Sequence, residues 1–185
     1  SADLGISATY KFNDRISADA IIVNGEGYKK IQQNNGLNYG LGLTVNPISN
    51  FYVRLYGGLN TSGEVEDKDI ANIATFAGYK SDKFTMGVEY NYMQNSSFDS
   101  NADKDGYSIF ASVKLSKTTE LYARFDELSS KNELNSAKDE SAAIIGAQFK
   151  LGKYVKIAPN FRISMPKAEG AENYCSAYIS CYFGL

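Results

Sequence analysis

Histidine and tryptophan are missing from this 185-residue chain, and cysteine and proline are scarce, with two and three copies. Without histidine, and with only two cysteines, the chain can form neither a Cys/His zinc site nor a histidine-based acid–base pair. Serine-rich stretches such as Ser129-Ser130 therefore lack the partner that a serine nucleophile needs. We expect no enzymatic activity.

Long apolar runs are also missing, and the stretch Ala142–Ile145 is typical of the longest. A membrane-spanning helix needs about 18 or more such residues, so the chain has no candidate for one. The mean hydropathy of −0.33 and the net charge of −2 resemble those of a soluble domain without a basic field for nucleic acid. This hydropathy does not exclude a membrane β-barrel, whose apolar side chains occupy only alternate positions.

Alternation is the dominant pattern in what the sequence does contain. Apolar and polar residues interleave with a period of two, for example in Leu4–Phe12, Leu37–Val45 and Val155–Ile163. Such a period indicates β-strands with two unlike faces. Eleven runs of this kind lie near 2–12, 15–24, 37–46, 51–60, 71–80, 83–94, 106–116, 119–129, 141–151, 154–164 and 173–185.

The length of these runs selects between two all-β architectures. Many contain ten to twelve residues, whereas strands of globular proteins have about 5–6 and tilted strands that cross a bilayer have about 9–11. We therefore predict an all-β fold, an antiparallel up-and-down transmembrane β-barrel, rather than a soluble β-sandwich.

The connections between the runs alternate between short and long. Tight turns are expected at Asn13-Asp14, Pro47–Asn50, Ser81-Asp82, Ser116–Thr118 and Gly152-Lys153, and long polar segments at 25–36, 61–70, 95–105, 130–140 and 165–172. Outer-membrane barrels have short periplasmic turns and longer extracellular loops. The pattern predicts the outer membrane of a Gram-negative bacterium, with the short turns in the periplasm.

Aromatic residues gather near both ends of the expected strands. One group, Tyr10, Phe12, Phe51, Tyr79, Phe84 and Tyr154, lies beside the short turns, and another, Tyr39, Tyr90, Tyr92 and Tyr107, lies nearer the long segments. Two such bands are typical of the girdles at membrane interfaces. The alternative is that these rings fill the core of a sandwich.

An odd number of strands places Ser1 on the long-loop side of the sheet, whereas single-chain bacterial barrels normally have an even number. We therefore expect residues 1–185 to form a single β-barrel domain that is the C-terminal portion of a larger barrel.

Three segments carry a family resemblance: Ala2–Lys30 with its VNGEGY loop, Ala74–Tyr92, and Gly106–Ser130 with its ELYARFD strand. They resemble the later part of bacterial outer-membrane porins of the phosphate-selective type, especially those of the Bacteroidota. The resemblance implies a barrel of about 16 strands, often a homotrimer, that passes small solutes.

The residues between the apolar positions should face the interior. These pore-lining candidates are Lys11, Arg15, Arg54, Lys114, Arg124, Lys150, Lys156 and Arg162, with the acids Asp3, Asp19, Glu89, Glu120 and Asp126. Lysine and arginine in a pore favour anions, so the excess of cations predicts a mild anion preference. The alternative is a polar wall whose charges pair across strands.

The sequence thus predicts a porin, a water-filled channel for passive diffusion of small hydrophilic solutes. The alternative is a non-conducting structural or partner-binding barrel within a larger complex, plugged by bulky inner residues such as Tyr52, Tyr56, Phe110 and Tyr122. Expected partners are outer-membrane lipid, lipopolysaccharide and small hydrophilic solutes or anions, and the barrel is expected to form a homotrimer or to belong to a larger complex.

One acidic segment, DSNADKDG, places the oxygen-bearing residues Asp99, Asn101, Asp103 and Asp105 at alternate positions. This spacing resembles the start of a calcium-binding loop, although Ser112 stands where the motif needs a bidentate glutamate. A loop calcium ion is the one cofactor that the sequence suggests. A solvated acidic loop is the alternative.

The two cysteines, Cys175 and Cys181, are six positions apart in the last run and therefore share one face. A straight strand would separate them by about 20 Å, which is too far for a disulfide. We interpret them as small apolar residues on the lipid side.

Overall fold

The computed structural model describes residues 3–25, 35–64, 68–131 and 136–184. Eleven strands form one sheet in which every strand pairs with its sequence neighbours, in the order β1 to β11. Every pairing is antiparallel. The strands are β1 (Gly5–Lys11), β2 (Ile16–Val23), β3 (Asn38–Ile48), β4 (Phe51–Asn60), β5 (Ile70–Lys80), β6 (Phe84–Gln94), β7 (Lys104–Lys114), β8 (Thr119–Ser130), β9 (Glu140–Leu151), β10 (Val155–Pro166) and β11 (Tyr174–Phe183).

Each of the eleven predicted runs corresponds to one of these strands, which confirms the all-β, up-and-down prediction. Two details differ. Strand β3 continues to Ile48 through a register shift after Val45, because Asn50 adopts a left-handed φ of 69° that allows a tighter turn than expected. A short 3₁₀ helix, η1 (Ser96–Phe98), lies in a segment that was expected to be loop only.

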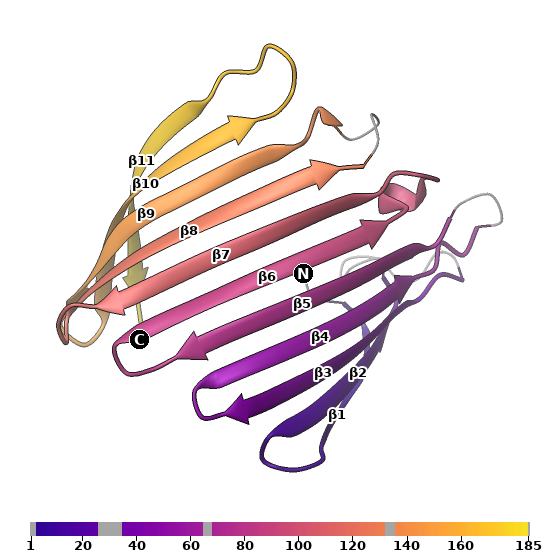
Figure 1. Cartoon of the computed structure of the whole chain (residues 1–185), viewed down its shortest axis with the longest axis horizontal. Helices are drawn as coiled ribbons and strands as arrows, with labels where there is room; N and C mark the ends of the chain where they lie inside the picture. Colours follow the sequence, from indigo (N-terminus) through magenta and orange to yellow (C-terminus); the bar gives the residue numbers. More distant parts are fainter. Residues whose placement is uncertain (1–2, 26–34, 65–67, 132–135, 185) are drawn as a thin grey trace.

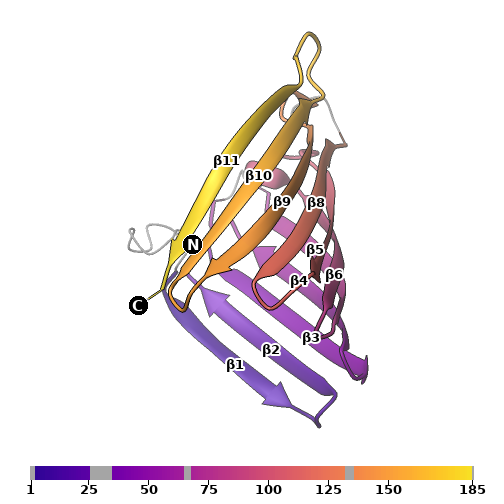
Figure 2. The same ribbon diagram turned by 90° about the vertical axis from the view of Figure 1, so that its left-hand side faces the viewer.

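The sheet is strongly twisted and curled, so that its first and last strands lie on the same side of the molecule (Figures 1 and 2). In the described part of the chain β1 pairs only with β2, and β11 only with β10. In Figure 2 these two edge strands lie at the left, where β11 runs toward the top of the view and β1 toward the bottom. The fold is therefore an open, barrel-shaped wall.

The tight turns lie at one end of this wall, and polar side chains hold them. The Asn13 carboxamide oxygen accepts hydrogen bonds from the backbone N–H groups of Arg15 and Ile16, at 2.8 and 3.0 Å. Ser116 Oγ accepts in the same way from Thr118 and Thr119. These are the local side-chain bonds that favour turns over continued strands.

A conventional hydrophobic core is missing from the described residues, where Ala102 is the one buried apolar side chain. Large apolar residues are instead exposed, including Ile6, Leu41, Ile145 and Ile179 at 63–74%. A sandwich core of aromatic rings is therefore wrong for this sheet, because a single layer has no second sheet to cover it. None of the described helices is long and apolar enough to cross a membrane.

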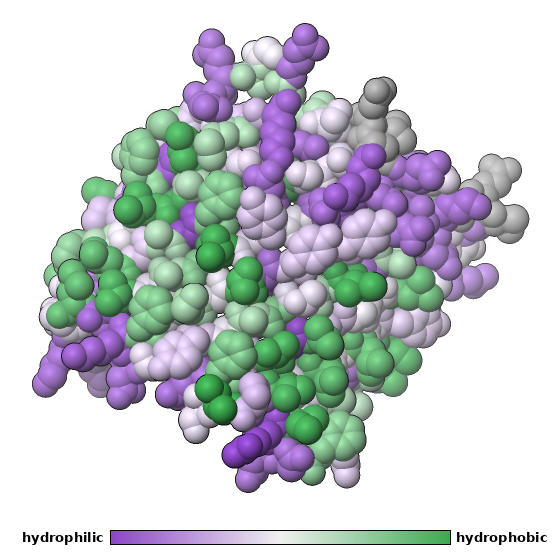
Figure 3. Space-filling view, in the orientation of Figure 1, coloured by the Kyte–Doolittle hydropathy of each residue, from purple (hydrophilic) through white to green (hydrophobic). Residues whose placement is uncertain are grey.

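Cross-strand register collects these exposed residues on one face. Outward positions pair with outward positions across the whole sheet, as in the row Tyr39, Leu59 and Ala71, and in the row Ile109, Phe125 and Ala143. Figure 3 shows green and pale atoms over the middle of this face and purple atoms gathered at its margins. The face thus has the layout of a surface that lies against lipid.

At the opposite end of the wall, aspartates close the bases of long connections. Asp69, Asp103 and Asp139 each lie directly before a strand. The carboxylate of each accepts a hydrogen bond from a backbone N–H group at or just beyond the end of the preceding strand. The donors are Ser62, Asn95 and Ser130, at 3.1, 2.9 and 2.8 Å. Each carboxylate therefore joins the two ends of a connection before it leaves the sheet.

Candidate pore-lining face

The concave face of the sheet carries the charged residues that the sequence assigned to the pore. Register places Lys11, Asp19, Arg54, Glu89, Lys114, Glu120, Arg124, Asp126, Lys150, Lys156 and Arg162 on this inner face, opposite to the apolar positions. Arg15 lies in the turn before β2, and Asp3 precedes β1. The face is thus assembled from strands throughout the sheet.

Arg54 and Asp19 form the most complete ion pair on this face. Arg54 Nη1 donates to Asp19 Oδ1 at 2.6 Å, and Nη2 donates to Oδ2 at 2.8 Å. Arg54 Nη1 also donates to Thr44 Oγ1 at 3.0 Å. The guanidinium crosses Gly42, where a Cβ would lie 2.3 Å from Nη2. A glycine at position 42 therefore leaves the space through which this two-pronged contact forms.

The remaining inner charges are less evenly matched. Arg124 Nε donates to both oxygens of Asp126 at 2.8 Å, while Glu89 and Glu120 accept from Asn91 and Ser112 respectively. Arg162 lies over the Tyr178 ring, 4.6 Å from its centroid. Arginine at this position therefore has a cation–π partner rather than an acidic one.

The two ends of the wall carry opposite net charge. The short-turn rim (residues 11–16, 48–52, 80–84, 114–120 and 150–156) contains nine cations and three acids. The cations are Lys11, Arg15, Lys80, Lys83, Lys114, Lys117, Lys150, Lys153 and Lys156, and the acids are Asp14, Asp82 and Glu120. None of these cations forms an ion pair within the described ranges.

Acids outnumber cations at the long-loop rim. This rim consists of the described residues of the long connections, at the end of the wall opposite to the tight turns, and of the strand residues next to them. The acids are Asp3, Glu64, Asp69, Asp99, Asp103, Asp105, Glu127, Asp139, Glu140, Glu169 and Glu172, and the cations are Lys68, Lys104, Lys131, Lys138 and Lys167. Two of these cations are paired: Lys131 with Asp105 at 2.7 Å, and Lys167 with Glu127. The hydrogen bond that Lys131 donates to Asp105 raises the pKa of Lys131.

Large aromatic side chains of the inner face lie against the wall, above glycines. The rings of Tyr52, Phe76 and Phe110 form a stacked row with centroids 6.3 Å apart. A Cβ at Gly87 would lie 2.6 Å from the Phe110 ring and 2.9 Å from the Phe76 ring, and one at Gly78 would meet Phe76 and Tyr52. The missing glycine side chains thus provide the space that these rings occupy.

Sequence reasoning missed several inner residues. Phe76, Lys80, Lys104 and Glu140 lie on the inner face by register, and the alternation of their own strands was the signal that could have placed them. The alternation could not predict that Phe76 stacks on two neighbouring rings. This contact depends on how adjacent strands are aligned, which the sequence of a single strand does not specify.

The suggested calcium residues take part in other contacts. Asp103 accepts from Tyr92 Oη at 2.8 Å as well as from the Asn95 backbone, and Asp105 accepts from Tyr90 Oη at 3.0 Å. Within the described ranges, no three acidic or cysteine side chains gather as a metal site would require. A calcium ion held by Asp99, Asn101, Asp103 and Asp105 stays a prediction.

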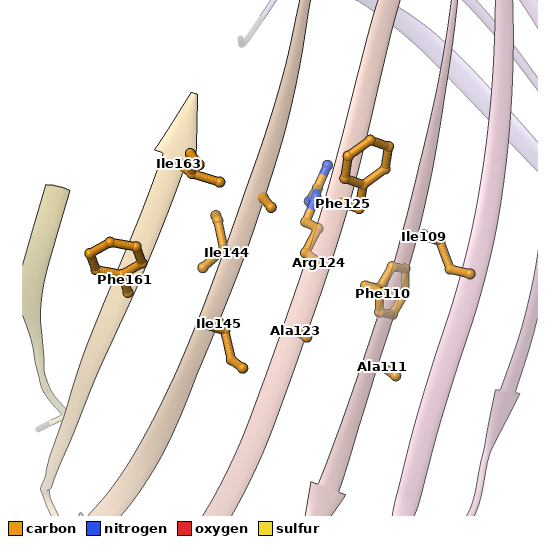
Figure 4. Close-up of a pocket in the computed structure, with 11 residues that line it drawn as sticks. Ile109, Phe110, Ala111, Ala123, Arg124, Phe125, Ile144, Ile145, Phe161 and Ile163 are labelled. Atoms are coloured by element: carbon orange, nitrogen blue, oxygen red, sulfur yellow. The ribbon is translucent and has the colours of Figure 1, made fainter. Parts of the chain in front are cut away.

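The outer face contains an apolar hollow of about 370 Å³ between strands β7 and β10. Figure 4 shows its lining, in which the small side chains of Ala111 and Ala123 lie among larger residues such as Ile109 and Phe125. It lies on the lipid-type surface and not on the charged face. Cys175 and Cys181 are free and exposed, and they pair in register with the outward residues Ile163 and Ile157.

An up-and-down sheet with an apolar convex face and a charged concave face is the layout of the wall of a transmembrane β-barrel. The chain belongs to the family described as "Putative beta-barrel porin-2, OmpL-like", whose model matches residues 2–163. Family and fold both agree with the outer-membrane β-barrel that the alternation predicts. Among curated proteins, none matches it.

Solved structures of porins and of another outer-membrane protein share this fold at low sequence identity. A porin refined at 1.8 Å resolution aligns with a TM-score of 0.73 at 13% identity, over 96% of this chain and 60% of that porin. The trimer form of OmpT from Vibrio cholerae aligns with a TM-score of 0.63 at 14% identity, over 97% and 64%. The NanC porin aligns with a TM-score of 0.56 at 11% identity, over 97% and 91%. The chain thus spans less than two thirds of the first two proteins.

Separating Arg54 from Asp19 should change the selectivity of the pore more than its stability. Asp19→Asn should shift the reversal potential in a salt gradient toward anion preference, because it removes an acid and leaves Arg54 without a charged partner. Arg54→Gln should shift it toward cations. Both groups are about one third exposed, at 36% and 32%, so each variant should lose no more than about 1 kcal/mol of unfolding free energy.

The double variant Asp19→Asn/Arg54→Gln removes one charge of each sign and should return the reversal potential close to that of the wild type. Equal shifts in the same direction for both single variants would contradict the placement of this pair in the conducting path.

Proposed function

We propose that the protein is a water-filled channel for passive diffusion of small hydrophilic solutes, with a mild preference for anions. The observation that carries this proposal is the division of one sheet into an exposed apolar face and an inner face lined by Lys, Arg, Asp and Glu. A wall of this kind needs lipid on one side and water on the other.

The arrangement of the inner aromatic rings supports an open interior. Tyr52, Phe76 and Phe110 stack along the wall, and the Tyr122 ring lies over Gly146, where a Cβ would be 2.6 Å from it. Rings that lie over glycines extend along the wall rather than across the space in front of it. This supports conduction over the plugged scaffold that bulky inner residues suggested.

Unpaired cations support the anion preference. The acids Asp19 and Asp126 are each held by an arginine, whereas Lys11, Lys150 and Lys156 form no ion pair in the described ranges. Free cations in a pore raise the local concentration of anions. Preference for phosphate over other anions, which the resemblance to phosphate-selective porins of the Bacteroidota implies, belongs to the same proposal.

We also propose that the short turns face the periplasm and the long loops the exterior, where lipopolysaccharide would contact them, and that the protein forms homotrimers. The OmpT structure is described as a trimer form, and shared architecture supports the analogy. That residues 1–185 belong to a single domain of a larger barrel, of about 16 strands, remains a prediction.

Planar-bilayer recording tests the proposed function directly. The full-length protein should give discrete single-channel steps, and a potassium chloride gradient should give a reversal potential of the sign that indicates anion preference. Cation preference would contradict the anion part of the proposal. Absence of any step from protein that shows heat-modifiable migration on gels would favour the non-conducting scaffold instead.

A further inference from the structure

We propose that the two mouths of the channel differ in charge, so that the short-turn mouth captures multivalent oxyanions on the inner-face pair Lys150 and Lys156. This inference rests on the proposed channel function, and it adds a binding position and a direction. The ligand class is a solute with several anionic oxygens, such as a phosphate chain or a polycarboxylate.

The register of β9 and β10 supplies the first observation. Lys150 and Lys156 are direct cross-strand partners, and both point to the inner face. Directly opposed like charges destabilise an antiparallel pair, by the same cross-strand contacts through which opposite charges stabilise it. The repulsion between these two lysines therefore destabilises the sheet when no ligand is bound. An anion that lies between them would replace this repulsion by attraction.

The lysine pair forms no ion pair with its surroundings in the described part of the chain. The acid of the short-turn rim that shares their face, Glu120, lies directly opposite Lys114 and accepts a hydrogen bond from Ser112 Oγ at 2.6 Å. Lys156 lies over the Tyr182 ring, 5.6 Å from its centroid. This cation–π contact attracts the ammonium group to the ring but brings no negatively charged group to it.

The charge of the whole rim supplies the third observation. The short-turn rim carries nine cations against three acids, and the described part of the long-loop rim carries eleven acids against five cations. At about 0.1 M salt the Debye length is about 10 Å, so neighbouring charges along one rim act together while the two rims do not cancel. Anions should therefore accumulate at one mouth and be depleted at the other.

One-sided block by inorganic tripolyphosphate tests the proposal in the full-length protein. A biotin-acceptor tag inserted after Gly170, in the β10–β11 connection, reports orientation through the side on which streptavidin binds. In 0.1 M potassium chloride, tripolyphosphate should reduce the current at lower concentration when added on the short-turn side. The open-channel current should also rectify, with anions entering more readily from that side.

The double variant Lys150→Gln/Lys156→Gln should raise the half-blocking concentration on the short-turn side about tenfold, which corresponds to about 1.4 kcal/mol. The control Lys104→Gln/Lys138→Gln removes the same charge from the long-loop rim and should retain wild-type block. Heat-modifiable migration checks that both variants are folded.

The outcomes separate the two proposals. Conduction with equal block from both sides in the wild type would overturn the capture site and leave the channel standing. Sided block that the Lys150→Gln/Lys156→Gln variant retains would overturn the assignment to this pair. Absence of conduction from folded protein would overturn both proposals.

Discussion

Arginine in place of Ile109 should destabilise the protein in a bilayer by about 2–4 kcal/mol, the cost of a charge at mid-depth on the lipid face of a barrel. Ile109 lies at the centre of β7, points outward and is 48% exposed, and its cross-strand partners are Val88 and Phe125. No acid lies opposite it to compensate the charge. Urea titration in lipid vesicles, followed by tyrosine fluorescence and gel migration, measures the change.

The neighbouring residue provides the matched control. Ser108 belongs to the same strand at nearly the same depth but faces inward, where its partners are Glu89 and Asp126. Ser108→Arg introduces the same charge and should change the unfolding free energy by less than about 1 kcal/mol. Equal losses for Ile109→Arg and Ser108→Arg would contradict the assignment of the two faces.

Valine in place of Gly87 should give the second large effect, a loss of about 1–3 kcal/mol together with a lower conductance. The new Cβ would meet the Phe110 ring at 2.6 Å and the Phe76 ring at 2.9 Å, and such overpacking forces side chains away from their preferred positions. The rings can yield only by leaving the wall toward the interior. Single-channel recording and urea titration measure the two effects.

Gly57→Val is the control for this substitution. Gly57 is also a strand glycine, but it faces outward and a Cβ there has no heavy atom within 4 Å. We expect it to be neutral or to stabilise by about 0.5–1 kcal/mol, because valine loses less chain entropy than glycine. Adding Phe110→Ala to Gly87→Val should recover part of the conductance. If conductance stays low in that double variant, the rings are not the cause.

The strands and their faces were predictable because both depend on information within one strand. A period of two in Val155–Ile163 specifies which side chains share a face whatever lies beside them. Strand length then separated the membrane wall from the sandwich, since a bilayer fixes the span that each strand must cover. These two local rules were enough to place Arg54 and Lys150 on the inner face.

Contacts between strands were not predictable in the same way. The Arg54–Asp19 pair joins residues on β4 and β2, across Gly42 of the intervening strand, and it requires a lateral alignment that no single run encodes. Asp103 shows the same limit for local contacts. Its spacing suggested a calcium ligand, which stays a prediction, but gave no sign that its carboxylate accepts hydrogen bonds from Asn95 and Tyr92.

The aspartates at the loop bases have a consequence for how this protein can vary. Because Asp69 joins Ser62, and Asp139 joins Ser130, each connection is closed by the sheet's own residues before its tip begins. Strand pairing therefore does not depend on what the tips contain, and longer tips add little closure entropy. The connections at this end of the wall can therefore change in length and sequence while the sheet that carries them stays the same.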